Sequence, residues 1–258
     1  MGPAIIPEAH IDPATALCSG SAQYLQASPE LYMKRLLSKG VPRLFQICKC
    51  FRNNERGRLH LPELTMIEWY AANETYLDLM DQCQGLLVHI ARGLGMGHSI
   101  DYQEIPIDLG SGFRRISVAK AFEKYASESV EAALESNRFD EIMGFEIEPF
   151  LGLGRPTILY DYPACLASLA KLKPGKSHLA QRFELYAAGM ELANGFTELI
   201  DAQVQRHRFE EENRTRREME LNDLPLPERF LTDLETMPEA AGIALGLDRL
   251  VMLFCDAP

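Results

Sequence analysis

The 258-residue chain lacks the features that mark several specialised classes of protein. Its six cysteines include no C-x-x-C pair, so we expect free, buried thiols in a reducing cytosol rather than a zinc site or disulfides. No signal peptide and no apolar run of about 18 residues is present, which predicts a cytoplasmic protein that does not span a membrane. Basic residues are not in excess either. The formal net charge of −11 argues against a broad nucleic-acid surface, although it is compatible with a small cationic pocket.

What is present is an ordinary globular composition, 47% hydrophobic and 24% charged, which allows a substantial core. No internal repeat, low-complexity tract or long linker divides the chain. The sequence has neither a Walker A loop nor a dinucleotide-binding fingerprint. We therefore predict a single α+β domain over residues 1–258.

Hydrophobic periodicity and end signals predict alternating helices and strands. Helices are expected over 28–40, 76–94, 115–147 and 202–220, the last of them charged and largely solvated. Strands are expected over 43–52, 64–72, 182–199 and 242–246, with an antiparallel pair across 43–72 and a turn near Gly189. Residues 1–27 are expected to be irregular and 157–170 mixed. Asn194-Gly195 indicates either a two-residue hairpin or a bulge beside a ligand.

Four cationic or potentially cationic side chains lie within nine residues: Arg52, at the end of an expected strand, and Arg56, Arg58 and His60 in the loop that follows. Such a group is typical of a clamp for a polyphosphate, because guanidinium groups match phosphate oxygens in shape and charge. Two alternatives stay open. Arg52 alone is equally compatible with a structural ion pair, and the loop alone with a solvated charged surface.

Glu184 and Glu191 fall on the two halves of the expected hairpin near Gly189. Two close carboxylates repel each other, which raises a pKa unless a cation lies between them. Their hard oxygen atoms, together with phosphate oxygens of a ligand, would suit Mg²⁺. The alternative is that each carboxylate pairs separately, with Arg182 or with lysines.

Glu30, Glu68 and Glu198 are three further carboxylates that we expect to face a ligand cleft, with Tyr70 on the same strand face as Glu68. Burying unpaired charges is costly, so this grouping favours a ligand that carries ammonium groups. Glu30 also has a simpler interpretation, since an acid is favoured at a helix N-terminus.

The segment 242–249 is a Gly-rich strand that runs into a helix near Asp248. Glycines would let a flat ligand approach the backbone closely. Arg249, near the start of the helix, would be placed to hold a terminal phosphate.

Together these segments resemble the catalytic domain of class II aminoacyl-tRNA synthetases of the lysine type. Phe51–Glu68 resembles motif 2 of that family, Gly242–Arg249 resembles motif 3, and Glu191–Leu199 resembles the lysine-specific segment between them. The resemblance runs from about Pro3 to the C-terminus. Three ordered motifs with matching internal spacing are far more specific than any one of them.

Within this group the chain is more similar to the elongation factor P–lysine ligases, which are truncated paralogues of lysyl-tRNA synthetase. Ser28 stands where the synthetases usually have Ala, and Ala244 where they usually have Gly. The segments 162–164 and 167–170 also resemble the ligases. The resemblance implies an antiparallel sheet flanked by helices, with motif 1 largely missing and no anticodon-binding domain. The family implies a homodimer, whereas the shortened motif 1 argues against one.

The resemblance implies a role for each candidate residue. ATP would be bound by Arg52, Asn54 or Glu55, His60, Leu64 and Arg249, with Arg52 and Arg249 as the catalytic groups. Mg²⁺ would be held by Glu184 and Glu191. The lysine-like substrate would be bound by Ser28, Glu30, Glu68, Tyr70, Asn194, Phe196, Glu198 and Ala244. The family usually has Glu at position 54 and an adenine-stacking Phe at position 64, so both Asn54 and Glu55 are candidates and Leu64 would make a weaker wall.

The implied activity is ATP-dependent conversion of a lysine-like amino acid, with β-lysine favoured over α-lysine, into an aminoacyl-adenylate. The acyl group would then pass to a lysine side chain of elongation factor P, without tRNA and without a covalent enzyme nucleophile. Two alternatives stay open: a catalytic fragment of a lysine–tRNA ligase, and a catalytically inactive regulatory paralogue.

Overall fold

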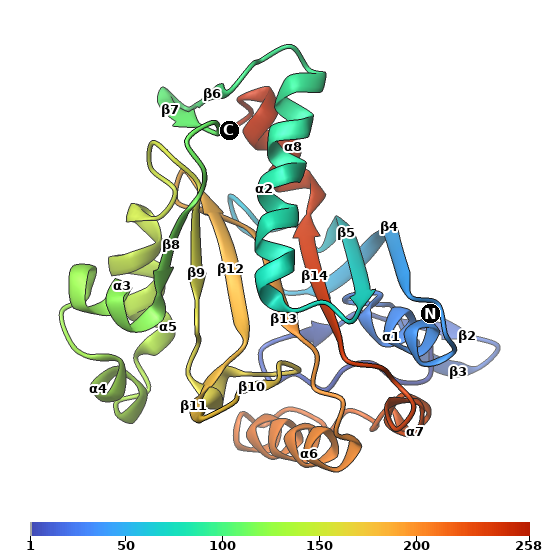
Figure 1. Ribbon diagram of the computed structural model, residues 1–258. Coiled ribbons are helices and arrows are strands. Elements are labelled where there is room, and N and C mark those ends of the chain that lie inside the picture. Colours follow the sequence, from blue (N-terminus) through green and yellow to red (C-terminus); the bar gives the residue numbers. More distant parts are fainter. Residues whose placement is uncertain (1) are drawn as a thin grey trace. The chain divides into compact units, whose positions relative to one another are not determined.

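A computed structural model describes residues 2–258 of the chain, which divide into two compact units (Figure 1). The first unit comprises the chain as far as Asn73 together with Glu198–Gly246. The second comprises Glu74–Thr197 together with Leu247–Pro258. Each unit therefore combines segments that are distant in sequence, and each has its own strands, helices and buried apolar side chains.

The first unit is built on four antiparallel strands in the order β1-β4-β5-β14. They are β1 (Asp12–Pro13), β4 (Arg43–Asn53), β5 (Glu63–Ala72) and β14 (Ala240–Gly246). The pairing of β4 with β5 across a polar loop confirms the antiparallel pair that the sequence predicts. A short hairpin of β2 (Thr15–Cys18) and β3 (Ser21–Tyr24) makes the N-terminal region more regular than expected.

Side chains alternate across β5 as the sequence predicts. Met66, Glu68 and Tyr70 point to one face and are buried. Trp69, on the other face, is only partly buried and pairs with the exposed Phe45 of β4. The strand thus places a glutamate and a tyrosine inside the unit, although neither residue type is usual there.

Helix α1 (Glu30–Ser38) begins close to the predicted position. The Ser28 Oγ atom accepts a hydrogen bond from the backbone N–H of Glu30 at 3.0 Å, which satisfies one of the donors that a helix start leaves without an internal partner. The helix ends before Gly40, whose φ of +90° lies in the left-handed region that favours glycine.

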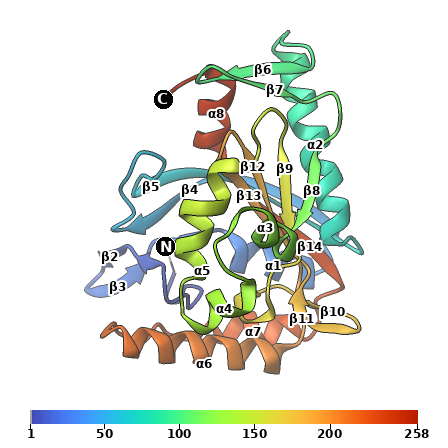
Figure 2. The same ribbon diagram turned by 90° about the vertical axis from the view of Figure 1, so that its left-hand side faces the viewer.

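Helix α6 (Ala202–Glu218) is charged, and most of its residues are exposed or partly buried, as predicted. One stripe at helical spacing is buried, and it consists of Gln205, Phe209, Asn213 and Arg216. The Phe209 ring lies 6.3 Å from that of Phe230 in α7 (Glu228–Leu234), and the two helices lie side by side in Figure 2. Arg216 donates hydrogen bonds to two backbone carbonyls of the N-terminal segment. Its guanidinium group therefore ties that segment to the helix.

The second unit is built on four strands in the order β13-β12-β9-β8, of which only β8 and β9 pair in parallel. They are β8 (Arg114–Ser117), β9 (Thr157–Tyr160), β12 (Arg182–Ala187) and β13 (Met190–Thr197). The turn between β12 and β13 falls at Gly189, as predicted. Together with the antiparallel strands of the first unit, these strands confirm the α+β class.

The hairpin interpretation of Asn194-Gly195 is wrong, because both residues continue β13 and pair with Glu184 and Phe183. The register of β12 with β13 instead shifts between Leu185 and Tyr186, which displaces the bulge from the predicted position. An Asn-Gly pair favours a tight turn when it lies between two strands. Here it lies inside one strand, and hydrogen bonds to the neighbouring strand outweigh the local preference for a turn.

Helix α2 (Tyr76–Gly93) matches its predicted range closely. Its start has a capping box, in which the Asp78 carboxylate accepts hydrogen bonds from the Thr75 backbone N–H at 2.8 Å and the Thr75 hydroxyl at 2.7 Å. The remaining elements of the unit are β6 (Ser99–Tyr102), β7 (Ile105–Asp108), η3 (Ala164–Leu166), β10 (Leu172–Lys173), β11 (Lys176–Ala180) and α8 (Leu247–Cys255).

The helical structure predicted over 115–147 is confirmed from Val118 onward, although it is interrupted and its first residues belong to a strand. The segment starts as β8 and continues as five short helical pieces: α3 (Val118–Tyr125), α4 (Val130–Glu135), α5 (Phe139–Ile142), η1 (Met143–Ile147) and η2 (Glu148–Phe150). The hydroxyls of Ser117 and Ser129 each accept a hydrogen bond from a backbone N–H and start a new helix. Asn137, with a φ of +55°, separates α4 from α5. The apolar periodicity was therefore correct, but the capping residues cut it into pieces.

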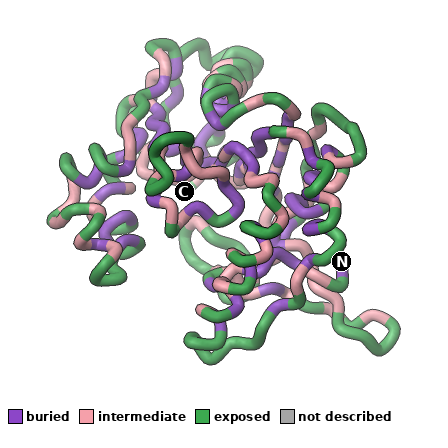
Figure 3. The backbone as a smooth tube through the Cα atoms, turned by 60° about the horizontal axis from the view of Figure 1, so that its bottom comes forward, coloured by how far each residue is buried: buried purple, intermediate pink, exposed green. Residues whose placement is uncertain are grey.

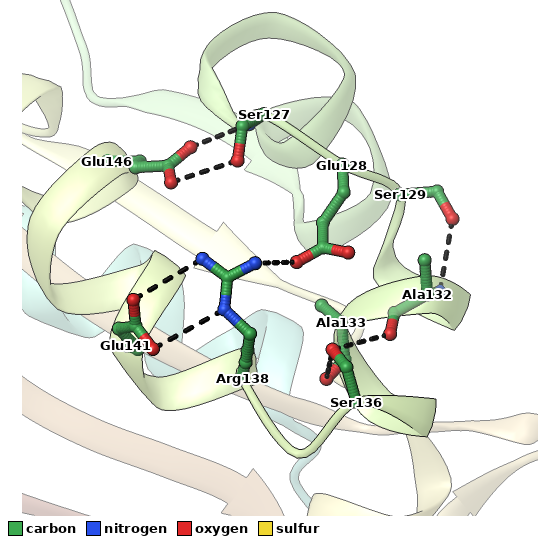
Figure 4. Close-up of polar contacts among 9 residues, drawn as sticks. All are labelled: Ser127, Glu128, Ser129, Ala132, Ala133, Ser136, Arg138, Glu141 and Glu146. Atoms are coloured by element: carbon green, nitrogen blue, oxygen red, sulfur yellow. Dashed lines mark hydrogen bonds and ion pairs between the residues drawn. The ribbon is translucent and has the colours of Figure 1, made fainter.

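Polar contacts hold the turns between these pieces (Figure 4). The Arg138 guanidinium donates to Glu128 at 2.8 Å and also contacts the Glu141 carboxylate. The Glu146 carboxylate accepts hydrogen bonds from the backbone N–H and the hydroxyl of Ser127. These groups are largely exposed, so each contact contributes little stability and mainly fixes the path of the chain.

Figure 3 shows buried, intermediate and exposed stretches alternating along the backbone. All six cysteines are free, as predicted, but the expectation that they are buried holds only for Cys50 and Cys83. Cys18 and Cys48 are partly buried, and Cys165 and Cys255 are exposed. Cys48 and Cys50 lie on the same face of β4, with their sulfur atoms 3.9 Å apart.

Candidate active site

Three glutamates of the first unit gather around one buried lysine. Glu30 and Lys34 lie one turn apart on α1, and the Lys34 ammonium contacts the Glu30 carboxylate. The same ammonium lies 2.5 Å from Oε2 of Glu198, the residue that directly follows β13. Lys34 is 2% exposed, and both Glu198 and the neighbouring Glu68 are completely buried. Such a concentration of charge away from water is costly and needs an explanation beyond folding.

Glu68 is held by two hydroxyl groups. Its Oε1 atom accepts a hydrogen bond from Ser28 at 2.7 Å, and its Oε2 atom accepts one from Tyr70 at 2.8 Å. The Ser28 hydroxyl also accepts the hydrogen bond from the backbone N–H of Glu30, so one side chain links the first residue of α1 to the carboxylate of β5. This arrangement fixes the orientation of Glu68.

The carboxyl groups of this cluster bind protons more readily than exposed carboxyl groups do. Burial, followed by repulsion from Glu30, raises the pKa of Glu68 to about 8. Burial also raises the pKa of Glu198 to about 8, with Lys34 opposing the shift and Glu30 adding to it. Within residues 2–258, neither carboxylate oxygen of Glu198 has a hydrogen-bond partner of normal geometry. An added ammonium group would supply the missing donors and favour the ionised carboxylates.

Strand β14 closes one side of this cluster. A Cβ atom added to Gly242 would lie 2.1 Å from the Tyr70 ring and 2.5 Å from Oε1 of Glu198. The glycine therefore makes room for the protein's own side chains at this point, rather than for a flat ligand. Two residues further on, Ala244 pairs with Glu68 across the sheet.

Arg52 lies at the end of β4, with about a quarter of its side chain exposed. Its guanidinium group lies 3.6 Å from the Glu55 carboxylate and donates weakly to the backbone carbonyl of Ala27 at 3.5 Å. Asn54 has a φ of +59° and donates instead to the Asp12 carboxylate at 2.7 Å. Of the two candidates that the sequence leaves open, Glu55 therefore lies beside Arg52 and Asn54 is turned away from it.

The other cations of this loop, Arg56, Arg58 and His60, are exposed to solvent. Leu64, at the start of β5, is partly buried and pairs with Cys50. The loop thus presents positive charge at the end of the β4–β5 pair, which is compatible with both the clamp and the solvated surface that the sequence allows.

In the second unit, Glu184 of β12 is the centre of a hydrogen-bond network. Its Oε1 atom accepts from Arg182 at 2.7 Å, and its Oε2 atom accepts from Tyr186 at 2.6 Å and from Tyr162. The Arg182 guanidinium lies 4.5 Å from the centre of the Tyr162 ring and also donates to Asn194 at 3.2 Å. The ion pair with Arg182 that the sequence leaves as an alternative is therefore present.

Glu191 and Arg249 form a second pair in this unit. The Arg249 guanidinium donates to the backbone carbonyl of Glu191 at 2.7 Å and lies 3.3 Å from its carboxylate. Burial, followed by repulsion from Glu184, raises the pKa of Glu191 to about 7. The same two causes raise the pKa of Glu148, which contacts Tyr186 at 3.1 Å.

The negative charge of the Glu148, Glu184 and Glu191 carboxylates would suit a divalent cation. A cation would relieve the repulsion that contributes to the raised pKa values of Glu148 and Glu191, and carboxylate oxygens are the ligands that Mg²⁺ prefers. Glu184 has limited capacity, since three donors already occupy its two oxygens. Within residues 2–258, no group of three or more His, Cys, Asp or Glu side chains is arranged as a metal site. Magnesium binding by Glu184 and Glu191 therefore stays a prediction.

The structure divides the predicted site residues between the two units. The first unit contains Ser28, Glu30, Arg52, Asn54, Glu55, His60, Leu64, Glu68, Tyr70, Glu198 and Ala244. The second contains Glu184, Glu191, Asn194, Phe196 and Arg249. Phe196 packs beside the buried alanines at 167, 170 and 180.

Four residues of these clusters were not assigned from the sequence: Lys34, Glu148, Tyr162 and Tyr186. Tyr186 did carry a signal, because it lies two residues after Glu184 and so on the same face of β12. Tyr162 looks like an ordinary core residue in the sequence and reaches Glu184 only through the tertiary fold. Lys34 did carry a signal, since it lies four residues after Glu30 on the same helix face. Its burial is evident only in the structure.

Comparison with known proteins matches residues 11–258 to the family described as tRNA synthetases class II (D, K and N). The chain belongs to this family. It is 39% identical over 249 residues to the elongation factor P–(R)-β-lysine ligase of Pectobacterium carotovorum, covering 92% of this chain and 75% of that protein. It is 41% identical over 244 residues to the protein of the same name from Proteus mirabilis, covering 91% and 74%.

The protein of that name from Edwardsiella ictaluri is 37% identical over 276 residues, which cover all of this chain and 83% of the relative. These class II relatives agree with the fold class and with the ligase group that the motifs indicate. In the described part of the chain, no helix combines the length and the apolar character needed to cross a membrane.

Proposed function

We propose that the chain activates a lysine-like amino acid with ATP and transfers it to a lysine side chain of elongation factor P. The observation that carries this proposal is the buried cluster of Glu30, Glu68 and Glu198, in a chain whose relatives are named elongation factor P–(R)-β-lysine ligases. Buried carboxylates with raised pKa values suit a substrate with two ammonium groups. The relatives' name favours β-lysine over α-lysine.

The substrate site is assigned residue by residue. Glu30, Glu68 and Glu198 bind the ammonium groups, while Ser28 and Tyr70 orient Glu68 through its two oxygens. The other members of the predicted set are Asn194, Phe196 and Ala244. Of these, Ala244 adds a methyl group next to Glu68 and limits the space beside it.

The nucleotide site is assigned to the arginines. Arg52 would contact the α-phosphate of ATP, and Arg249 the outer phosphates, with Glu55 rather than Asn54 beside Arg52. The exposed His60 and the partly buried Leu64 complete the predicted set. Glu184 and Glu191 would hold Mg²⁺, whose positive charge would stabilise the phosphate oxygens.

The reaction needs no enzyme nucleophile. The substrate carboxylate attacks the α-phosphorus of ATP, the bond to the β-phosphate oxygen breaks, and pyrophosphate leaves. The amine of the acceptor lysine then attacks the acyl carbon of the aminoacyl-adenylate and releases AMP. The residues of the chain contribute by positioning the substrates and by stabilising negative charge on the phosphates.

We further propose that tRNA is not an acceptor and that the protein acts in the cytoplasm. The formal net charge of −11 supports the first point, because a tRNA-binding surface needs basic residues. The relatives are named for a translation factor, which supports the second.

The test is transfer of radiolabelled β-lysine or α-lysine to purified elongation factor P or to tRNA, with ATP and Mg²⁺. The proposal predicts labelled elongation factor P and unlabelled tRNA. Labelled tRNA would support a lysine–tRNA ligase fragment instead. Absence of labelling with both acceptors, together with absence of pyrophosphate exchange, would support an inactive paralogue.

A further inference from the structure

Lys34 has no place in the reaction described so far, although it is the most deeply buried cation of the carboxylate cluster. We propose that Lys34 is a positioning residue that sets the charge of this cluster to match a substrate with two ammonium groups. The inference rests on the proposed function for the identity of the ligand. It adds a residue that determines which ligands the cluster accepts.

The contacts of Lys34 support this role. Its ammonium contacts the Glu30 carboxylate on its own helix and lies 2.5 Å from the Glu198 carboxylate of a distant segment. A lysine that only joined two surface elements would keep its ammonium in water, because the side chain is long and flexible. Lys34 instead has 2% of its surface exposed, so its charge acts inside the cluster.

The charges in the cluster balance. Glu30, Glu68 and Glu198 contribute three negative charges when ionised, and Lys34 contributes one positive charge. Two negative charges are left, which is the number that the two ammonium groups of a diamino acid neutralise. Without Lys34 a third negative charge would be uncompensated, and a buried carboxylate would take up a proton instead.

The other titratable groups that face the cluster do not alter this balance. Burial lowers the pKa of Lys34, but the charges of Glu198 and Glu30 outweigh burial and raise it, so the ammonium stays protonated. Burial raises the pKa of Tyr70 well above its ordinary value, and Tyr70 stays neutral.

On β4, burial raises the pKa of the Cys48 and Cys50 thiols, which also face Glu68 and stay neutral. Arg52 is the remaining cation near these thiols, and its guanidinium lies beside the Glu55 carboxylate. Lys34 is therefore the cation that compensates the three glutamates.

The first test compares Lys34→Met with Lys34→Arg. Calorimetric titration of the intact chain with α-lysine and with β-lysine, without ATP, gives the affinity between pH 6 and pH 9. Loss of the ammonium raises the pKa values of the neighbouring carboxylates, so binding by Lys34→Met needs a higher pH. We expect affinity about tenfold weaker at pH 7, recovering toward pH 9, because a pKa shift of one unit corresponds to a factor of ten. Lys34→Arg keeps the charge and is expected to keep the pH profile of the unmodified protein.

Lys39→Met is the matched control. Lys39 follows the same helix, is exposed, and pairs with Asp233 on the surface. Its substitution is expected to leave the affinity and its pH profile unchanged. A Lys34→Met protein that is folded by circular dichroism and has the pH profile of the unmodified protein would overturn the inference.

A double variant, Lys34→Met with Glu30→Gln, covers the case in which Lys34→Met does not fold. It removes one positive and one negative charge and so returns the cluster to two negative charges. We expect its pH profile to match that of the unmodified protein, even if the affinity is lower. A profile displaced to higher pH would overturn the inference. If the unmodified protein binds neither lysine isomer, the proposed function fails, whereas lysine binding with an unchanged profile in the variants removes only the role of Lys34.

Discussion

Ala244 lies directly across the sheet from Glu68, in the antiparallel pairing of β14 with β5. Lysyl-tRNA synthetases, which this chain resembles, usually have glycine at this position, and alanine adds one methyl group. Residues paired across a sheet share a face, so this methyl group lies on the same face as the Glu68 carboxylate of the candidate substrate site. We propose that this position contributes to the choice between lysine isomers.

The first prediction concerns the choice of isomer. Ala244→Gly should improve use of α-lysine relative to β-lysine, because removing a methyl group from a tight pocket changes discrimination by roughly 1–3 kcal/mol. The measurement is kcat/KM for both isomers in both proteins. An unchanged ratio of the two values would remove Ala244 from the explanation of specificity and leave the function standing.

The second prediction concerns magnesium. Glu191→Gln should raise the Mg²⁺ concentration needed for half-maximal pyrophosphate exchange, because an amide is a weaker ligand for a hard cation than a carboxylate. Glu123→Gln, on the exposed side of α3, is the control and should leave the Mg²⁺ titration unchanged. If the Glu191→Gln titration coincides with that of the unmodified protein, Glu191 has a structural role only.

The third prediction concerns stability as a function of pH. Glu68 and Glu198 have pKa values of about 8 in the folded protein, well above those of exposed glutamates. The folded state therefore binds more protons than the unfolded state between about pH 5 and pH 8, and stability falls as the pH rises through that window. The melting temperature without substrate should decrease from pH 6 to pH 9.

Glu68→Gln should flatten this pH dependence, whatever its effect on the melting temperature itself, since the substituted amide does not titrate. A diamino acid should raise the melting temperature more at pH 9 than at pH 6, because the ionised carboxylates bind it. A melting temperature that rises steadily from pH 6 to pH 9 would contradict the raised pKa values.

The fourth prediction concerns packing at β14. Gly242→Ala should destabilise the protein by about 1–3 kcal/mol, because the new methyl group would overlap the Tyr70 ring and the Glu198 carboxylate. Gly85→Ala is the matched control: it lies inside α2, and a Cβ atom there would meet no other atom within 4 Å. That substitution should stabilise the helix by up to about 1 kcal/mol. Chemical denaturation gives the free energy of unfolding of each variant. If both substitutions change that free energy equally, the neighbours of Gly242 move aside without a measurable loss of stability, and the prediction is wrong.

Much of the fold could be predicted from local patterns. Alternation along β5 correctly placed Glu68 and Tyr70 on one face, and the helix expected over 28–40 is present as α1 (Glu30–Ser38). The pattern over 115–147 correctly indicated helices but not the strand at its start or the breaks between the pieces, because periodicity reports which positions are apolar and not where serine caps begin a new helix. Local sequence is informative where the determinant of structure is itself local.

The candidate site shows the same limit. The glutamates could be singled out because repeated carboxylates in apolar strands are unusual. The role of Lys34 depends on Glu198, which is remote in sequence and reaches the lysine only through the tertiary fold. The choice of Glu55 over Asn54 likewise depends on the positive φ of Asn54 and on its contact with Asp12. Neither contact has a signature in the sequence.

The most direct test of the account is ATP–pyrophosphate exchange by the unmodified protein and by Arg52→Ala, with β-lysine and with α-lysine. Exchange should depend on the amino acid and be faster with β-lysine. Arg52→Ala should lower the rate about a hundredfold, which corresponds to roughly 3 kcal/mol of lost transition-state stabilisation. Arg43→Ala, at the exposed start of β4, should leave the rate unchanged. Exchange that is absent with both isomers, or that is unaffected by the loss of Arg52, would contradict the proposal that this chain forms a lysine-like adenylate.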